Sequence, residues 1–193
     1  MNIITFDVET THTSKPNGDT TPLPYFGNRL VSIGYKELKT DVVYDCYYHS
    51  TEPPSWEAFS YFQGALDDCD VLIGHNIKFD LQWIRACGFV YEGDIYDTMV
   101  AEYILSKGQS QPLGLAAVAG KYGGVQKEKD LVKPYLDAGQ TFYDIPWDII
   151  EEYGQADVLA TEHVALAQLK EFETTFEELY GVKDSRPNIE AVA

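Results

Sequence analysis

The sequence predicts one α/β or α+β domain built around a mixed β-sheet. A length of 193 residues suits a single domain, and 45% hydrophobic with 13% aromatic residues is typical of a folded globular chain rather than a disordered one. Strand-like segments come first, then helical and strand-like segments alternate, and helices alone complete the chain. That order of elements favours a single sheet packed against helices.

Three strands are expected near the N-terminus. Runs of β-branched and aromatic residues occupy 2–8, 30–35 and 42–48, and the polar stretch 36–41 has the size of a hairpin connection. Residues 10–28 are rich in Thr, Pro and Gly, which predicts a long loop directly after the first strand.

Helical periodicity begins at Ser55, a suitable N-cap, because apolar residues recur from Trp56 to Leu66 every three or four positions. A short apolar run at 71–74 predicts a buried strand. Further helices are expected at 78–87, at 98–105 with Asp97 as N-cap, at 113–122, and from Trp147 to about Leu179 after Pro146.

Two features of the last part of the chain bear on domain organisation. Gly154 is expected to mark a break in the long C-terminal helix. The final residues lose helical periodicity, so we expect one domain at residues 1–181 and a tail or linker at 182–193.

Charge restricts the kind of partner. The chain has 14 Lys and Arg against 31 Asp and Glu, which gives a formal net charge of −17. This charge excludes binding of nucleic acid or an anionic membrane by electrostatic attraction to the whole protein surface. The three cysteines form no CxxC pair, no stretch is long and apolar enough to span a membrane, and the N-terminus does not resemble a signal peptide. We therefore expect a soluble, cytoplasmic protein with no membrane partner.

Acidic residues occur at three places where a sheet and its helices can bring them together. Asp7 and Glu9 are two positions apart on the first strand and so face the same side. Asp80 follows the apolar strand 71–74 at the start of a helix, and Tyr153 and Asp157 are four positions apart on one helix face. Converging carboxylates repel one another, and two divalent cations, Mg²⁺ or Mn²⁺, would offset this repulsion and attract a phosphate substrate.

These motifs, in this order, resemble the DEDD superfamily of 3′–5′ exonucleases. The Tyr153-x3-Asp157 ending resembles its tyrosine branch, which includes the proofreading domain of family A DNA polymerases and the ribonuclease D group. The histidine branch has a His five positions before the last Asp, where this chain has Glu152. The resemblance covers about residues 2–172 and implies an RNase H-like (DnaQ-like) fold, with a mixed sheet flanked by helices.

The resemblance also implies roles for particular residues. Two metal ions would be bound by four carboxylates, a tyrosine would orient the attacking water, and three further residues would lie near the terminal nucleotide. The metal-binding carboxylates would be Asp7, Glu9, Asp80 and Asp157. The tyrosine that orients the water would be Tyr153, and the residues near the terminal nucleotide would be Thr10, Asn76 and Phe79.

Several residues have a structural interpretation of equal or greater weight. Asn76 suits a helix-capping loop as well as a substrate contact, and Phe79 suits the core better than base stacking. His75 is expected to be structural. Lysines 121, 127, 129 and 133 suit a solvated face better than a strand-binding one, and Tyr25-Phe26 either stacks on bases or folds back onto the core.

The predicted function is a metal-dependent 3′–5′ exonuclease that releases nucleoside 5′-monophosphates from single-stranded DNA 3′ ends, with proofreading beside a DNA polymerase domain or subunit as its setting. The alternatives are a ribonuclease D-like enzyme acting on RNA and a non-catalytic module that binds nucleic acid or a polymerase.

Overall fold

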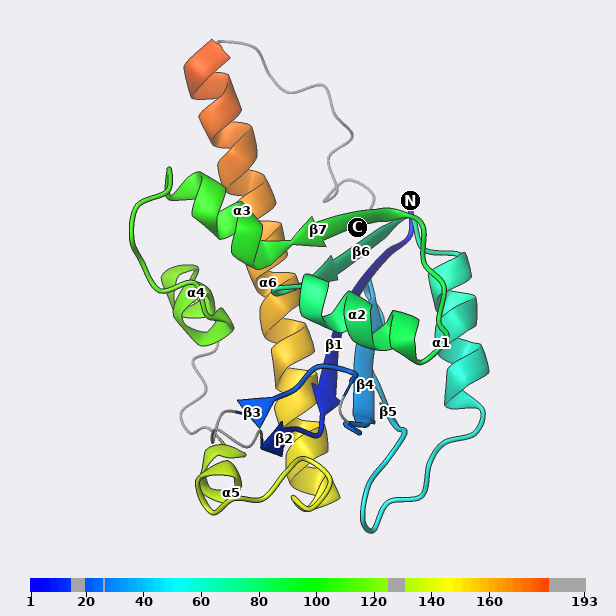
Figure 1. Cartoon of the computed structure of the whole chain (residues 1–193). Coiled ribbons are helices and arrows are strands. Elements are labelled where there is room, and N and C mark those ends of the chain that lie inside the picture. The colour runs from blue at the N-terminus through cyan, green and yellow to red at the C-terminus, as the bar shows by residue number, and fades with distance from the viewer. Residues whose placement is uncertain (15–19, 26, 125–130, 181–193) are drawn as a thin grey trace.

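The structure is a computed structural model that describes residues 1–14, 20–25, 27–124 and 131–180. Its centre is a five-stranded sheet in the order β5-β4-β1-β6-β7 (Figure 1). The strands are β1 (Ile3–Thr10), β4 (Leu30–Glu37), β5 (Val43–Cys46), β6 (Val71–Gly74) and β7 (Asp94–Asp97). Strand β1 pairs antiparallel with β4 and parallel with β6, so the predicted mixed sheet is confirmed.

The described residues form six helices around the sheet. They are α1 (Ala58–Asp67), α2 (Lys78–Ala86), α3 (Thr98–Leu105), α4 (Leu115–Lys121), α5 (Lys133–Asp137) and α6 (Trp147–Tyr180). Figure 1 shows the long helix α6 running behind the sheet, with α2 in front of it. None of the helices within the described ranges combines the length and the apolar character needed to cross a bilayer.

The alternation of side chains along β1 divides the core between the two faces of the sheet. Ile4, Phe6 and Val8 join the cluster formed with α1 and α2. Ile3 points the other way and packs with Ala165 of α6. Asp7 and Glu9 share the odd-numbered positions of Ile3, so they face α6.

The segment between β1 and β4 differs from the predicted long loop. Its described part contains a two-stranded sheet of β2 (Thr13–Ser14) and β3 (Thr20–Thr21). The buried Asn28 amide donates hydrogen bonds to the carbonyls of Thr21 and Leu23 at 2.7 and 2.8 Å. Trp83 Nε1 donates to the Pro22 carbonyl at 2.8 Å, which holds the segment against α2. Tyr25 remains 63% exposed, and Phe26 lies outside the described residues.

The start of α1 was predicted wrongly. The helix begins at Ala58, Ser55 is not its N-cap, and Trp56 is 88% exposed instead of lying on the buried face. The buried face of the helix therefore begins with Ala58 and continues through Phe62 and Leu66. By contrast, Asp97 caps α3 as predicted, because its side chain accepts hydrogen bonds from the Met99 and Val100 amides.

No break occurs at Gly154, since α6 is continuous through it. The glycine instead permits close packing: a Cβ atom there would lie 2.5 Å from Tyr44 Cζ and closer still to two neighbouring Tyr44 atoms. Elements β7 and α5 were not predicted. The proposed tail, residues 182–193, lies outside the described residues.

A buried carboxylate ties three helices together away from the sheet. Glu102 of α3 is 1% exposed and accepts hydrogen bonds from Lys121 of α4, Tyr122 and Gln168 of α6 at 2.9–3.1 Å. Burial raises the pKa of Glu102, but these hydrogen bonds outweigh it and hold the pKa below its usual value. Lys121 is thus engaged within the fold, Lys133 pairs with Asp137, and residues 127 and 129 lie outside the described ranges.

Candidate active site

Three carboxylates from two elements meet between the sheet and α6. Asp7 and Glu9 come from the central strand β1, and Asp157 comes from α6. One ligand oxygen from each lies within 4.8 Å of the others, with Glu9 buried and Asp7 partly exposed. The structure therefore brings together three of the four carboxylates that the sequence singled out.

Asp80 approaches this group from α2, on the other side of β1. It lies in the first turn of the helix and is 3% exposed, and its Oδ1 accepts a hydrogen bond from the Val8 amide at 3.2 Å. Burial, and then the negative charge of Asp7, raise the pKa of Asp80 well above its usual value. The fourth carboxylate thus lies next to the backbone between Asp7 and Glu9, outside the 4.8 Å group.

The donor set fits a hard divalent cation. All the groups are carboxylates, which are the protein ligands that Mg²⁺ and Mn²⁺ prefer, and no Cys is among them. Like charges at such distances disfavour the ionised forms unless an opposite charge is close. A metal ion supplies that charge, so the chemistry of the residues agrees with a metal centre.

Tyr153 lies on α6 one turn before Asp157. Its ring is half-buried and packs against Phe142, with centroids 6.0 Å apart. The four-residue spacing on a continuous helix places Tyr153 and Asp157 on the same face, as expected.

The three residues expected near a substrate occupy different environments. Thr10 is buried where the pairing of β1 with β4 shifts register, directly after Glu9. Asn76 is exposed with a positive φ of 58°, and its backbone amide donates a hydrogen bond to Asp97 Oδ1 at 3.0 Å. Phe79 is half-buried and packs against the main core cluster, which agrees with the structural interpretation of this residue.

His75 has a structural environment beside these residues. Its Nε2 donates to the Leu113 carbonyl and its Nδ1 shares a hydrogen bond with the Thr98 hydroxyl, both at 2.8 Å. Burial lowers its pKa. The ring therefore joins the end of β6 to α3 and the segment before α4.

Tyr44 is a neighbour of the carboxylates that the sequence did not indicate. It pairs with Gly34, which also pairs with Asp7 from the other side. Its hydroxyl forms a 2.8 Å hydrogen bond with Ser32, the cross-strand partner of Glu9. Burial, and then the charge of Glu9, raise the pKa of Tyr44 well above its usual value.

Only the missing side chains of two glycines make room for this tyrosine. A Cβ atom added at Gly34 would lie 2.8 Å from the Tyr44 ring, and a Cβ atom added at Gly154 would lie closer still to Tyr44. These glycines are 120 positions apart and come from β4 and α6. No local pattern could have identified them as a pair.

The sequence matches the 3'-5' exonuclease family over residues 2–173, which is most of the chain. This chain therefore belongs to the 3'-5' exonuclease family, as its motifs predicted. A DNA polymerase of Bacillus phage SP01 is 36% identical over 84 residues, or 42% of this chain and 9% of the polymerase. The match thus spans only a small part of that relative's length.

Solved structures confirm the fold. NrnC of Brucella melitensis, in a structure bound to pGG, aligns with a TM-score of 0.60 and 14% identity over 90% of this chain and 74% of NrnC. The family B DNA polymerase of the archaeon Pyrobaculum calidifontis aligns with a TM-score of 0.61 and 16% identity over 89% of this chain and 26% of the polymerase. At these identities the likeness concerns the fold.

Proposed function

We propose that this chain is a metal-dependent 3′–5′ exonuclease that removes nucleoside 5′-monophosphates from single-stranded DNA. The observation that carries the proposal is the meeting of Asp7, Glu9 and Asp157 between β1 and α6, with Asp80 beside them. Family membership supports the reaction class. The likeness to a phage DNA polymerase supports DNA as the substrate.

In this mechanism the four carboxylates hold two divalent cations, Mg²⁺ or Mn²⁺. When bound, such ions make water a stronger nucleophile and stabilise the charge that develops on the leaving oxygen. The protein's part is to hold its ligands on rigid elements: Asp7 and Glu9 on the central strand, Asp80 on α2 and Asp157 on α6. Fixed positions reduce the reorganisation needed in the transition state.

Tyr153 has a separate role in the proposal. Its hydroxyl orients the attacking water by a hydrogen bond, and its packing against Phe142 holds the ring in place. Thr10 and Asn76 contact the terminal nucleotide from the ends of β1 and β6. Phe79 contributes through its partly exposed edge.

The test is digestion of 5′-labelled DNA and RNA oligonucleotides with Mg²⁺, Mn²⁺ or EDTA. Wild-type protein is expected to shorten single-stranded DNA from the 3′ end with either metal and to be inactive in EDTA. Asp7→Asn and Asp157→Asn should each lower kcat by about 100- to 1000-fold, and Tyr153→Phe should lower it less. The exposed Asp41→Asn is the matched control.

Three outcomes would change the conclusion. Full activity of Asp7→Asn would refute the role of the carboxylates. Faster digestion of RNA than of DNA would make the ribonuclease D-like alternative correct. Tight binding of oligonucleotides without any cleavage by the wild-type protein would favour a non-catalytic module.

The setting of the reaction follows from the same proposal. We place the catalytic domain at residues 1–181, with 182–193 as a tail or linker, and proofreading beside a polymerase domain or subunit as its purpose. Digestion of primers with matched and mismatched 3′ ends, with and without a polymerase, tests this. Equal rates on both primers under all conditions would argue against proofreading.

A further inference from the structure

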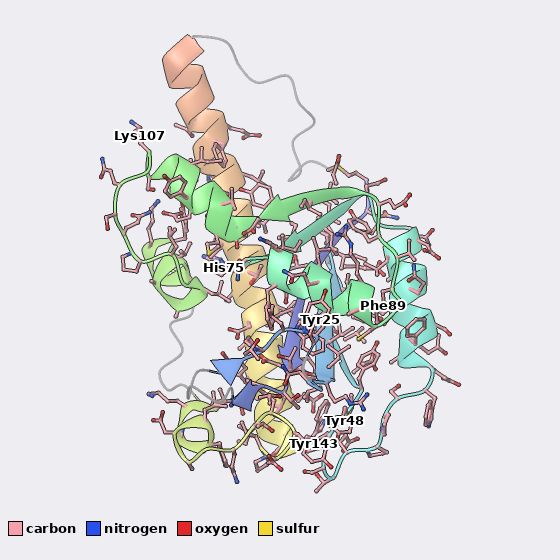
Figure 2. The ribbon with its side chains drawn as sticks, viewed as in Figure 1. Tyr25, Tyr48, His75, Phe89, Lys107 and Tyr143 are labelled. Atoms are coloured by element: carbon pink, nitrogen blue, oxygen red, sulfur yellow. The ribbon has the colours of Figure 1, made fainter. Side chains whose placement is uncertain are left out.

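An exposed stack of rings and one guanidinium lies beyond the end of β1. Tyr48 and Tyr143 are stacked with centroids 4.6 Å apart and planes inclined by 25°. The guanidinium carbon of Arg29 lies over the Tyr48 ring, 6.0 Å from its centroid. Tyr48 is 41% exposed, and Figure 2 shows it beside Tyr143 at the lower end of the molecule. We call these three residues the aromatic platform.

A continuous series of ring contacts connects the aromatic platform to the carboxylates. Tyr143 contacts the buried His49 ring at 6.4 Å, and His49 contacts Trp147 at 5.4 Å. Trp147 in turn contacts Tyr44 at 5.7 Å. Because Tyr44 lies beside Glu9, the series ends at the candidate active site.

Main-chain hydrogen bonds fix the segments that carry the platform. The Ser50 amide donates to the Tyr143 carbonyl at 3.0 Å, and the Tyr48 amide donates to the Val31 carbonyl at 3.1 Å. The His49 ring donates to the Ile145 carbonyl at 2.7 Å.

Arg29 is tied to the strand that carries the catalytic carboxylates. The Arg29 backbone amide donates a hydrogen bond to Thr11 Oγ1 at 2.8 Å, and the Thr11 backbone amide donates to the Arg29 carbonyl at 2.9 Å. These two hydrogen bonds hold the Arg29 backbone against the end of β1. Thr11 follows Glu9 by two positions. The platform is therefore built on the ends of β1, β4 and β5 and on the segment before α6.

The position of the platform suits a strand that leaves the candidate active site. Glu9 pairs with Ser32 and Ser32 pairs with Cys46, two residues before Tyr48. Two strand spacings separate Glu9 from Cys46 by roughly 10 Å, and Tyr48 lies two residues farther along the chain. The platform is therefore more than one strand away from the carboxylates, a position that suits a nucleotide upstream of the terminal one. Arg29 supplies a local positive charge on a chain whose net charge is −17.

We propose that the aromatic platform binds an upstream base of the single-stranded substrate, which inserts between the Arg29 guanidinium and the Tyr48 ring. This proposal rests on the proposed exonuclease function and adds a second binding site to it. A base between two planes needs about 7 Å, twice the usual contact separation of about 3.5 Å. The guanidinium carbon now lies 6.0 Å from the ring centroid, so the exposed Arg29 side chain must shift outward to admit a base. Stacking on a ring is tolerant of sequence, which suits a nuclease that shortens strands of any sequence.

Binding of a labelled oligodeoxythymidylate decamer in Ca²⁺, with its integrity checked on a gel, tests the proposal. Tyr48→Ala should weaken binding at least about fivefold, the effect of losing one base–aromatic stack. Tyr48→Phe, which keeps the ring, should bind like the wild type within about twofold. Tyr61→Ala, which removes a tyrosine that is 63% exposed on α1, is the control and should have no effect.

Arg29→Gln should weaken binding and make the logarithmic salt dependence shallower by at most about 0.7, the value for one phosphate neutralised on a single strand. Arg85→Gln, at an exposed arginine on α2, is the matched control and should leave the slope unchanged. The loss of binding affinity caused by Tyr48→Ala should be larger for the decamer than for a dinucleotide.

A fluorescent base placed at successive positions from the 3′ end gives a readout that a purely structural role would not move. 2-Aminopurine should be quenched on binding at one upstream position in the wild type, and this quenching should disappear in Tyr48→Ala. If the wild type cleaves DNA but Tyr48→Ala binds and quenches like it, the platform proposal is wrong and the exonuclease function stands. If the wild type neither cleaves nor binds, both proposals fail.

Discussion

Substitution of Gly154 by alanine should destabilise this protein, although the same change usually stabilises a helix. Alanine is favoured over glycine in a helix interior by about 1 kcal/mol. At Gly154 the added methyl would lie 2.5 Å from Tyr44 Cζ, well inside contact distance, and nearer still to two other Tyr44 atoms. Tyr44 is held by Ser32 on one side and by Trp147 on the other. Overpacking costs about 1–3 kcal/mol, and the short distances to Tyr44 place Gly154→Ala at the upper end of that range. After the helix-propensity gain is subtracted, we expect a net loss of up to about 2 kcal/mol.

Thermal unfolding in the presence of EDTA measures this loss. For a domain of this size each kcal/mol shifts Tm by about 2–4 °C, so Gly154→Ala should melt several degrees below the wild type. Gly64→Ala in α1 is the matched control, because a Cβ there meets nothing within 4 Å, and it should melt above the wild type. The double variant Gly154→Ala, Tyr44→Leu should lose less than the sum of the two single variants. A rise in Tm for Gly154→Ala equal to that for Gly64→Ala would refute the packing argument.

Three further predictions concern charge and thiol chemistry. Asp7→Asn should raise Tm in EDTA, because it removes repulsion worth about 1–3 kcal/mol per pair at the 4.8 Å separation of the carboxylate group, and the gain should shrink when Mg²⁺ is added. Glu102→Gln should lower the free energy of unfolding at pH 7 by about 1–3 kcal/mol. Because the folded-state pKa of Glu102 is lowered, its stabilisation is fully present above the unfolded-state pKa and is lost as pH falls through the folded-state pKa. The difference in unfolding free energy between the two proteins should therefore begin to shrink as pH falls below about 4.3, the usual pKa of Glu in an unfolded chain, and should disappear at lower pH. Cys87 is exposed while Cys46 and Cys69 are buried, and burial raises the pKa of Cys46 to about 11, so a thiol reagent should modify one cysteine per native chain and three after unfolding.

The parts of the fold that could be predicted are those fixed by local chemistry. Strand β1 was found because its β-branched and aromatic run is buried on both faces, and α3 because Asp97 supplies a side-chain cap. The convergence of Asp7 and Glu9 toward α6 follows from alternation along a strand. Each of these depends on residues within a few positions of one another.

The parts that could not be predicted depend on distant residues. Strand β7 has polar ends and exists as a strand through its parallel pairing with β6. Gly154 suggested a helix break because its local propensity is poor, whereas its packing partner Tyr44 lies 110 positions earlier. In the same way, the aromatic platform joins side chains from three separate segments, and no local sequence pattern groups them.

The distribution of charge explains how so acidic a chain can handle a polyanion. The carboxylates that would repel a phosphodiester are the same groups that attract divalent cations, so the sign of the local potential depends on the metal. Away from them, we propose that a base is held by stacking between the Arg29 guanidinium and the Tyr48 ring, an attraction that does not need a basic surface. We expect a net charge of −17 to weaken binding of any nucleic acid that does not reach both places, which agrees with the proposed action on free single-stranded ends.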